Sequence, residues 1–226
     1  MKYLAIDLGA SSGRGIIGEF NGDKLSLREI HRFSNDPVTL NGSLHWDILR
    51  ILFEIKNAIG KCAISDDADT SSIAIDTWGV DYGLLDKNGR LLGNPYHYRN
   101  DRTEGIQEKV FDIVPGKEVY SRTGIQFMNF NTLFQLRAEL LENPKAFDQA
   151  DKLLFTPDLL GYFLTGEKQT EYTIASTGAL LNAKTRDWDF ELMKKLGIPE
   201  RIFTDISMPG SVVGSILPSI TEEYGG

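Results

Sequence analysis

The chain has 226 residues, of which 41% are hydrophobic and 25% charged, the balance of an ordinary globular protein. Its net charge of −8 and its lack of any long Lys/Arg cluster argue against nucleic acid as a partner, because neutralising phosphates supplies most of that affinity. A single cysteine excludes an intrachain disulfide and a cysteine zinc site. The first apolar run is too short for a signal peptide, and no run approaches the roughly 18 apolar residues of a membrane span, so we expect a cytoplasmic protein with no membrane partner.

Residues 3–20 predict a strand, a loop and a second strand. The apolar residues 3–6 show no polar alternation, which is typical of a strand covered on both faces in the middle of a sheet. Asp7 ends this strand. A carboxylate at the edge of a core is costly unless it is paired, hydrogen-bonded or metal-bound, so Asp7 needs a compensating partner.

The loop after Asp7 has the composition of a phosphate cradle. Gly9 and Gly13 permit a positive φ and close approach to the backbone, while Ser11, Ser12 and the free amides supply donors. A carboxylate beside a polyphosphate is repelled unless a cation lies between them, and Mg²⁺ with its retained waters is the simplest choice. Neither common phosphate-loop pattern is present. An ordinary β-hairpin with Asp7 as a turn carboxylate remains an alternative.

The next elements alternate between strand and helix. A turn at residues 21–23 leads into a third strand over 24–33, so three antiparallel strands begin the fold. Apolar residues at helical spacing predict a helix over 48–59, with Asp47 as its cap and Gly60 as its stop. A buried strand follows at 72–76, and residues 82–92 read as a hairpin around the turn at 86–89.

From residue 101 the pattern becomes helical. Residues 170–182 fit strand and helix equally, and residues 208–210 open a final extended piece. The expected helices cover residues 102–111, 115–121, 131–142, 157–164 and 190–196. These elements predict an α/β fold of the ribonuclease H-like kind with a mixed sheet. Residues 1–100 would form its core, 101–206 a mainly helical cap with ligand-pocket elements, and 207–226 a return strand or linker.

Two strands of this expected sheet end in an aspartate that a glycine follows closely, at Asp7 and Asp76. If they are parallel neighbours, their carboxyl ends open into one crevice, the usual ligand position in such sheets. Asp76 could equally be a loop carboxylate that holds Trp78, and Trp78 could simply be core. Tyr98 and Arg102 belong to a polar cluster suited to grip hydroxyl groups, or else to a solvated helix start.

The stretch IDLGASSGR at residues 6–14 resembles the first phosphate motif of the actin, hexokinase and sugar kinase superfamily, in the form used by carbohydrate kinases of the glycerol, xylulose and rhamnulose type. Later stretches, in the same order, are most similar to the rhamnulokinase members of that family. These are IDTWGVD at 75–81, YR at 98–99, RT at 102–103, GIQF at 124–127 and NTL at 131–133.

The resemblance implies ATP-dependent phosphorylation of a ketose, L-rhamnulose at its 1-hydroxyl, with ATP and Mg²⁺ as cofactors. It implies that Asp7 holds Mg²⁺ through water. The residues that would cradle the transferring phosphate are Ala10, Ser11, Ser12, Gly13 and Arg14. Those that would meet the ketose are Gly79 and Arg102, with Asp76, Trp78 and Tyr98 beside them. Many relatives have Asp where this chain has Asn100, which removes one expected sugar contact.

The catalytic base of such kinases is an aspartate in a His-Asp-Thr type motif, and residues 1–226 contain no such motif. We therefore expect the base beyond Gly226, in a second domain absent from this chain, and we expect the chain alone to be inactive. Another ketose, L-fuculose or D-xylulose, is an alternative substrate. A noncatalytic sugar sensor or an actin-like nucleotide-binding module is an alternative of another class.

Overall fold

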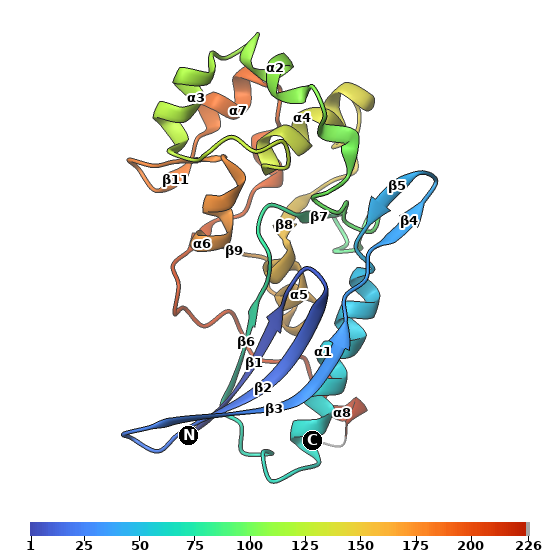
Figure 1. Cartoon of the computed structure of the whole chain (residues 1–226), viewed down its shortest axis with the longest axis vertical. Helices are drawn as coiled ribbons and strands as arrows, with labels where there is room; N and C mark the ends of the chain where they lie inside the picture. Colours follow the sequence, from blue (N-terminus) through green and yellow to red (C-terminus); the bar gives the residue numbers. More distant parts are fainter. Residues whose placement is uncertain (225–226) are drawn as a thin grey trace.

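In the computed structural model, which describes residues 1–224, a sheet with its covering helices lies at one end of the long axis (Figure 1). A group of short helices, the cap, lies at the other end. The strands are β1 (Lys2–Leu8), β2 (Ser12–Phe20), β3 (Leu25–Ser34), β4 (Val38–Leu40), β5 (Ser43–His45), β6 (Ser72–Asp76), β7 (Tyr82–Leu85), β8 (Lys152–Phe155), β9 (Thr170–Glu171), β10 (Leu181–Asn182), β11 (Asp187–Trp188) and β12 (Ile206–Ser207). The helices are α1 (Ile48–Ala63), α2 (Ile106–Phe111), α3 (Gly116–Thr123), α4 (Thr132–Glu142), α5 (Thr156–Thr165), α6 (Tyr172–Ala175), α7 (Phe190–Lys195) and α8 (Pro218–Glu223), with single 3-10 turns at η1 (Asp101–Thr103), η2 (Ser176–Gly178) and η3 (Glu200–Ile202).

The main sheet has four strands in the order β3-β2-β1-β6. The first three are antiparallel, as predicted, because each follows its neighbour through a tight turn. Strand β6 lies parallel to β1, with Asp76 directly beside Asp7. The prediction that these two strands are parallel neighbours is confirmed, and their two terminal carboxylates therefore meet at one edge of the sheet.

Strand β1 is covered on one face only. Leu4, Ile6 and Leu8 are almost fully buried, whereas Ala5 between them is exposed. The expectation of a strand buried on both faces is therefore wrong. Small and apolar residues such as Ala5 hide the alternation in the sequence, and only the burial pattern shows that one face of the sheet lacks a covering helix.

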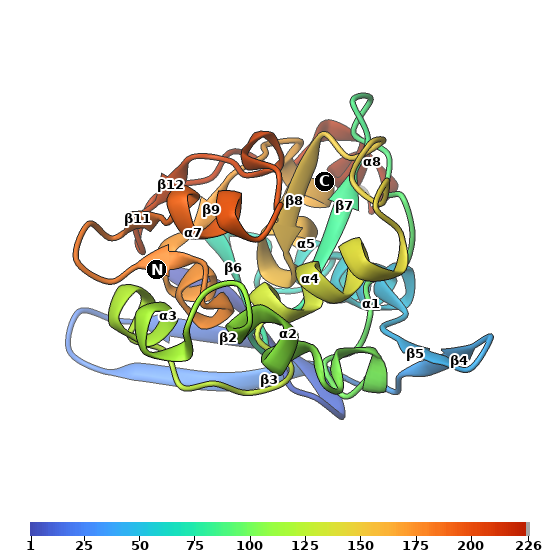
Figure 2. The ribbon, with the colours of Figure 1, turned by 90° about the horizontal axis from the view of Figure 1, so that it is seen from above.

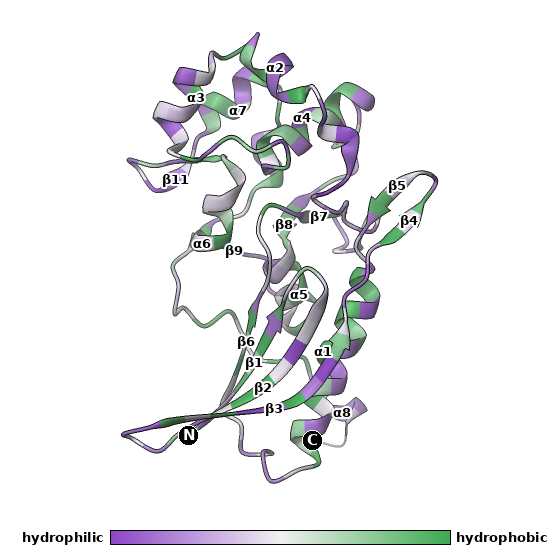
Figure 3. Cartoon of the chain, viewed as in Figure 1, coloured by the Kyte–Doolittle hydropathy of each residue, from purple (hydrophilic) through white to green (hydrophobic). Residues whose placement is uncertain are grey.

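Helix α1 covers the other face of the sheet, and both hydrophobic and hydrophilic residues occur along its length (Figure 3). Its buried side includes Ile51 and Ile55, and Asp47 caps its start as predicted, with Oδ1 accepting from the Arg50 amide at 3.1 Å. The helix continues through Gly60 instead of ending there. A Cβ at Gly60 would collide with the Tyr224 ring, so this glycine makes room for the segment after α8.

Strand β7 pairs mainly with β8, from far along the chain, and the two lie side by side in Figure 2. The expected local hairpin is reduced to a turn at residues 86–89 and a single bridge between Leu85 and Leu91. Residues 84–85 of β7 therefore pair both with β8 and with residues 91–92. The sequence pattern predicted only the pairing with residues 91–92, which are close in the chain.

The cap forms its own hydrophobic core, which includes Leu133, Phe134 and Leu136 of α4. The helix expected over residues 102–111 is split at Gly105, whose φ of +67° ends the η1 turn before α2 begins. Helix α5 falls within the expected cap range, but Leu159 and Leu160 pack into the core of the main sheet. Among the described residues, the helices are all too short or too polar to cross a membrane.

Candidate functional site

Asp7 lies at the carboxyl end of β1, opposite Arg14 in the antiparallel register with β2. Arg14 Nη2 donates to Asp7 Oδ2, and both side chains are about two-fifths exposed. This pair supplies the compensating partner that a carboxylate at this position needs. Arg14, expected to contact the transferring phosphate, is therefore engaged with the expected magnesium residue in this structure.

The loop between β1 and β2 keeps several donors free. Its ends are tied by the Gly9 amide, which donates to Ser12 O at 2.8 Å, and by Asn35, whose Nδ2 donates to Gly9 O at 2.8 Å. Within residues 1–224 the amides of Ala10 and Ser11 donate to no protein acceptor, and the hydroxyls of Ser11 and Ser12 are also unpaired. The loop can therefore offer amide and hydroxyl donors to an anion.

The structure does not support the expectation that Gly9 and Gly13 are needed for a positive φ. Gly9 and Gly13 do not adopt a positive φ. Gly13 is buried, and a Cβ there would collide with the Phe33 ring and lie 2.8 Å from Leu8 Cδ2. Its missing side chain allows the strands to pack against β3. The amides of Ala10 and Ser11, and not the conformation of the glycines, supply the unpaired backbone donors of this loop.

The residues around Asp7 fit a magnesium ion held through water. Asp7 Oδ1 accepts no hydrogen bond from the described residues, and the exposed Asp76 carboxylate on the next strand makes no side-chain hydrogen bond or ion pair with them. In residues 1–224 there is no group of three or more His, Cys, Asp or Glu side chains that could hold a metal directly. Mg²⁺ commonly keeps its waters and uses one or two carboxylates, which is the donor set present here.

Gly79 faces the cap. A Cβ at Gly79 would lie 2.9 Å from Thr177 Oγ1 and 3.0 Å from both Thr177 Cβ and Cγ2. Thr177 Oγ1 also accepts from the Val80 amide at 3.0 Å, so the two segments are pressed together. The absence of a side chain at Gly79 is thus explained by protein packing.

Trp78 and Tyr98 belong to one aromatic cluster. The ring of Trp78 stacks on Trp46 with centroids 3.7 Å apart, and Trp46 stacks in turn on His97 at 4.0 Å. Tyr98 stacks on His97 at 4.6 Å and meets Phe130 edge-on. Trp78 and Tyr98 are only partly buried, so each keeps some surface for a ligand while its ring is held by the protein.

Arg102 is fixed by protein contacts. Its Nη1 lies 2.6 Å from Glu139 Oε2, its Nη2 donates to Gln135 Oε1 at 3.1 Å, and its guanidinium lies 3.8 Å from the Tyr96 ring centroid. Only 9% of its side-chain surface is exposed. Arg102 is therefore held rigidly at the cap, and any contact with sugar uses the small surface that remains.

Asn131 directly precedes α4 but makes no capping hydrogen bond with its side chain. Its Oδ1 accepts from the Met128 amide at 2.8 Å, and its Nδ2 donates to Thr177 O at 3.2 Å. It is buried, so it holds the loop before α4 against the same turn that contacts Gly79. Gln126, in the stretch GIQF that resembles the rhamnulokinases, is exposed.

Asp81 was not predicted as a site residue, although it ends the stretch IDTWGVD at residues 75–81. Asp81 is 1% exposed and accepts hydrogen bonds from Trp46, Trp78, Tyr98 and Gln135. Burial raises its pKa to about 6 although these donors favour the ionised form. The available signal was a carboxylate placed directly before the apolar run of a strand, where a buried charge requires partners.

The comparisons with known proteins agree with this architecture. A family model described as FGGY family of carbohydrate kinases, N-terminal domain, matches residues 2–226. The rhamnulokinase of Oceanobacillus iheyensis is 45% identical over 222 residues, which are 98% of this chain and 47% of that protein. The rhamnulokinase of Bacteroides thetaiotaomicron is 44% identical over 224 residues, 99% of this chain and 46% of that protein.

Solved structures give the same fold at lower identity. The ligand-bound xylulose kinase from Lactobacillus acidophilus superposes with a TM-score of 0.88 at 21% identity, covering 99% of this chain and 45% of that one. Gluconate kinase from the same organism gives 0.87 at 21% identity, covering 100% and 46%. These neighbours confirm the expected fold of the actin and hexokinase kind. The chain spans about half the length of the curated relatives it matches. By the match of its full described length, the chain belongs to the FGGY family of carbohydrate kinases.

Proposed function

We propose that this chain forms the phosphate-binding and ketose-binding half of an ATP-dependent ketose kinase, with L-rhamnulose phosphorylated at its 1-hydroxyl. The observation that carries the proposal is the matched pair Asp7 and Asp76 at the carboxyl ends of two parallel strands. The free amides of Ala10 and Ser11 lie in the loop that directly follows Asp7. A site for an anion and its metal therefore borders the segment expected to meet the sugar.

On the phosphate side, the Ala10 and Ser11 amides and the Ser11 and Ser12 hydroxyls would donate to oxygens of the transferring phosphate. Arg14 would leave Asp7 and add positive charge to the same group. When bound, Mg²⁺ supplies charge neutralisation for the phosphate oxygens, and Asp7 would hold it through water. A chain of net charge −8 needs this local positive potential to bind a nucleotide.

On the ketose side, the rings of Trp78 and Tyr98 would pack against the sugar while their positions stay fixed by Trp46 and His97. Gly79 and the exposed part of Arg102 would border the same space. The proposed division is residues 1–100 as core, 101–206 as cap and 207–226 as return segment, with a second domain supplying the base that accepts the hydroxyl proton.

The substrate assignment draws on the two rhamnulokinases that are 45% and 44% identical to this chain. Calorimetric titration of the chain with L-rhamnulose, L-fuculose and D-xylulose tests it. L-rhamnulose should bind most tightly, and a preference for either other ketose would refute the sugar assignment. Failure of every ketose to bind would contradict the ketose kinase proposal itself. Substantial ADP production by the chain alone with ATP, Mg²⁺ and L-rhamnulose would contradict the placement of the base in a second domain.

A further inference from the structure

The buried carboxylate of Asp81 accepts hydrogen bonds from four different residues. Its Oδ2 accepts from Trp46 Nε1 at 2.6 Å, from Trp78 Nε1 at 3.1 Å and from the Tyr98 amide at 3.0 Å. Its Oδ1 accepts from Gln135 Nε2 at 2.9 Å. Four N–H donors therefore converge on one group that is only an acceptor, a role that a carboxylate fills and an amide cannot fill completely.

The four donors come from four separate segments of the chain. Trp46 precedes α1, Trp78 follows β6, Tyr98 lies before the η1 turn and Gln135 belongs to α4. Trp78 and Tyr98 are two of the residues proposed to meet the ketose. Gln135 also accepts from the proposed ketose residue Arg102, so Asp81 reaches a third member of that group through one intermediate side chain.

The backbone beside Asp81 is held in an unusual conformation. Val80 has a φ of +68°, which is rare for a β-branched residue and marks strain that the surroundings must maintain. Its amide donates to Thr177 Oγ1 at 3.0 Å, and its carbonyl accepts from Thr132 Oγ1 at 2.7 Å and from Gln135 Nε2 at 3.3 Å. The peptide between Gly79 and Asp81 is therefore fixed by contacts from the cap.

We infer that Asp81 is a positioning residue of the ketose site, which holds Trp78, Tyr98 and, through Gln135, Arg102 in one arrangement without touching the sugar. This inference rests on the proposed ketose-binding function. A buried carboxylate whose four hydrogen-bond donors, three side chains and one backbone amide, are all uncharged is costly for stability, which is consistent with a role in geometry. Hydrophobic residues could fill the same volume but could not orient four N–H groups.

The ionisable groups around Asp81 do not change charge in the pH range in which Asp81 titrates. Burial, and then the charge of Arg99, lower the pKa of His97 to about 4, so His97 is neutral near pH 6. Burial raises the pKa of Tyr82 to about 12, so Tyr82 is also uncharged there. Arg102 remains charged beside Gln135 and its ion-pair partner Glu139. A change of charge at Asp81 near pH 6 therefore reaches the two indole N–H groups directly.

The first test needs no sugar. Nitrogen-15 NMR spectra between pH 4.5 and 8 should show the indole signals of Trp46 and Trp78 and the Tyr98 amide moving together, with one midpoint near 6. The indole of Trp188 donates to Thr204 O instead and serves as an internal reference that should not follow them. Asp81→Asn should abolish the shared titration. Independent midpoints, or a titration that survives in the variant, would overturn the inference.

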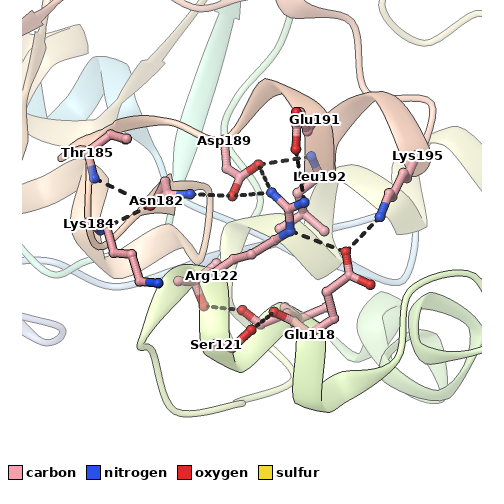
Figure 4. A network of polar contacts seen from close by, with 12 residues as sticks. Glu118, Ser121, Arg122, Asn182, Lys184, Thr185, Asp189, Glu191, Leu192 and Lys195 are labelled. Atoms are coloured by element: carbon pink, nitrogen blue, oxygen red, sulfur yellow. Dashed lines mark hydrogen bonds and ion pairs between the residues drawn. The ribbon is translucent and has the colours of Figure 1, made fainter.

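The second test compares two buried aspartates. Asp189 is 4% exposed and accepts from Arg122, Asn182 and the Leu192 amide in a polar network that does not include Asp81 (Figure 4). Asp81→Asn should weaken L-rhamnulose binding at least tenfold, because its amide turns a donor toward Gln135. Asp189→Asn should leave that affinity within twofold of wild type even if it lowers stability.

The outcomes separate this inference from the proposed function. Asp81→Asn protein that is folded and binds L-rhamnulose as tightly as wild type would refute a positioning role. If wild type binds no ketose, the kinase proposal fails, while the shared titration of the indoles and the Tyr98 amide still decides whether Asp81 organises these residues.

Discussion

Gly79→Ala separates two explanations of this glycine, close approach by a sugar and close packing by Thr177. The new Cβ would lie 2.9 Å from Thr177 Oγ1 and 3.0 Å from Thr177 Cγ2. Thr177 cannot rotate freely, because its Oγ1 donates to Ile174 O at 2.7 Å and accepts from the Val80 amide at 3.0 Å. Overpacking of about 1–3 kcal/mol, together with a lost hydrogen bond of about 1 kcal/mol, gives an expected destabilisation of about 2–4 kcal/mol.

Urea unfolding followed by circular dichroism measures this free energy in a double-mutant cycle. Thr177→Gly removes all three atoms that the new Cβ would meet, so in that background Gly79→Ala should cost less than about 1 kcal/mol. Gly93→Ala is the matched control, because a Cβ at Gly93 meets no atom within 4 Å and its effect should stay within about 0.5 kcal/mol. The packing argument is refuted if Gly79→Ala costs the same in both backgrounds, or if it removes ketose binding with no loss of stability.

Three further changes test other parts of the structure. Asn35→Ala removes the hydrogen bond to Gly9 O and should speed hydrogen exchange in residues 9–13, and unchanged exchange there would show that Asn35 does not hold the loop. Gly60→Ala should displace the Tyr224 ring and expose α8 to limited proteolysis, whereas protection equal to wild type would contradict the contact. Burial raises the pKa of Asp158 to about 8, so the folded state binds an extra proton and stability should fall as pH rises from about 4 to 8. Asp158→Asn should flatten that decline in urea unfolding, and an equally steep decline in the variant would exclude Asp158 as its source.

Much of the fold could be predicted from patterns of residues that lie close together in the sequence. Asp47 could be identified as a helix cap and the first three strands as antiparallel, because each depends on residues close together in the chain. The parallel register of Asp7 and Asp76 also followed, since strand, crossover helix and strand favour neighbouring positions in a sheet. The loop proposed to bind phosphate was singled out by its glycines and serines, although its free amides are those of Ala10 and Ser11.

Glycines were the least predictable residues, because their partners lie far away in sequence. Gly60 was expected to stop α1 but accommodates Tyr224, and Gly79 was expected to admit a sugar but packs on Thr177. Asp81 was missed for the same reason, since Trp46 and Gln135 lie 35 and 54 positions from it. Sequence shows that a residue is small or charged, whereas the contact that requires it depends on the tertiary fold.

The central claim is that the loop after Asp7 binds a metal-bridged phosphate next to the ketose residues. Titrating the nitrogen-15-labelled chain with Mg²⁺ and ATP in the presence of L-rhamnulose tests it at single residues. The account predicts saturable shifts of the Ala10 and Ser11 amides that Asp7→Asn weakens and that Asp23→Asn, in the remote turn between β2 and β3, leaves unchanged. Saturable binding with no shift at these two amides, or equal shifts in the Asp7→Asn variant, would contradict it.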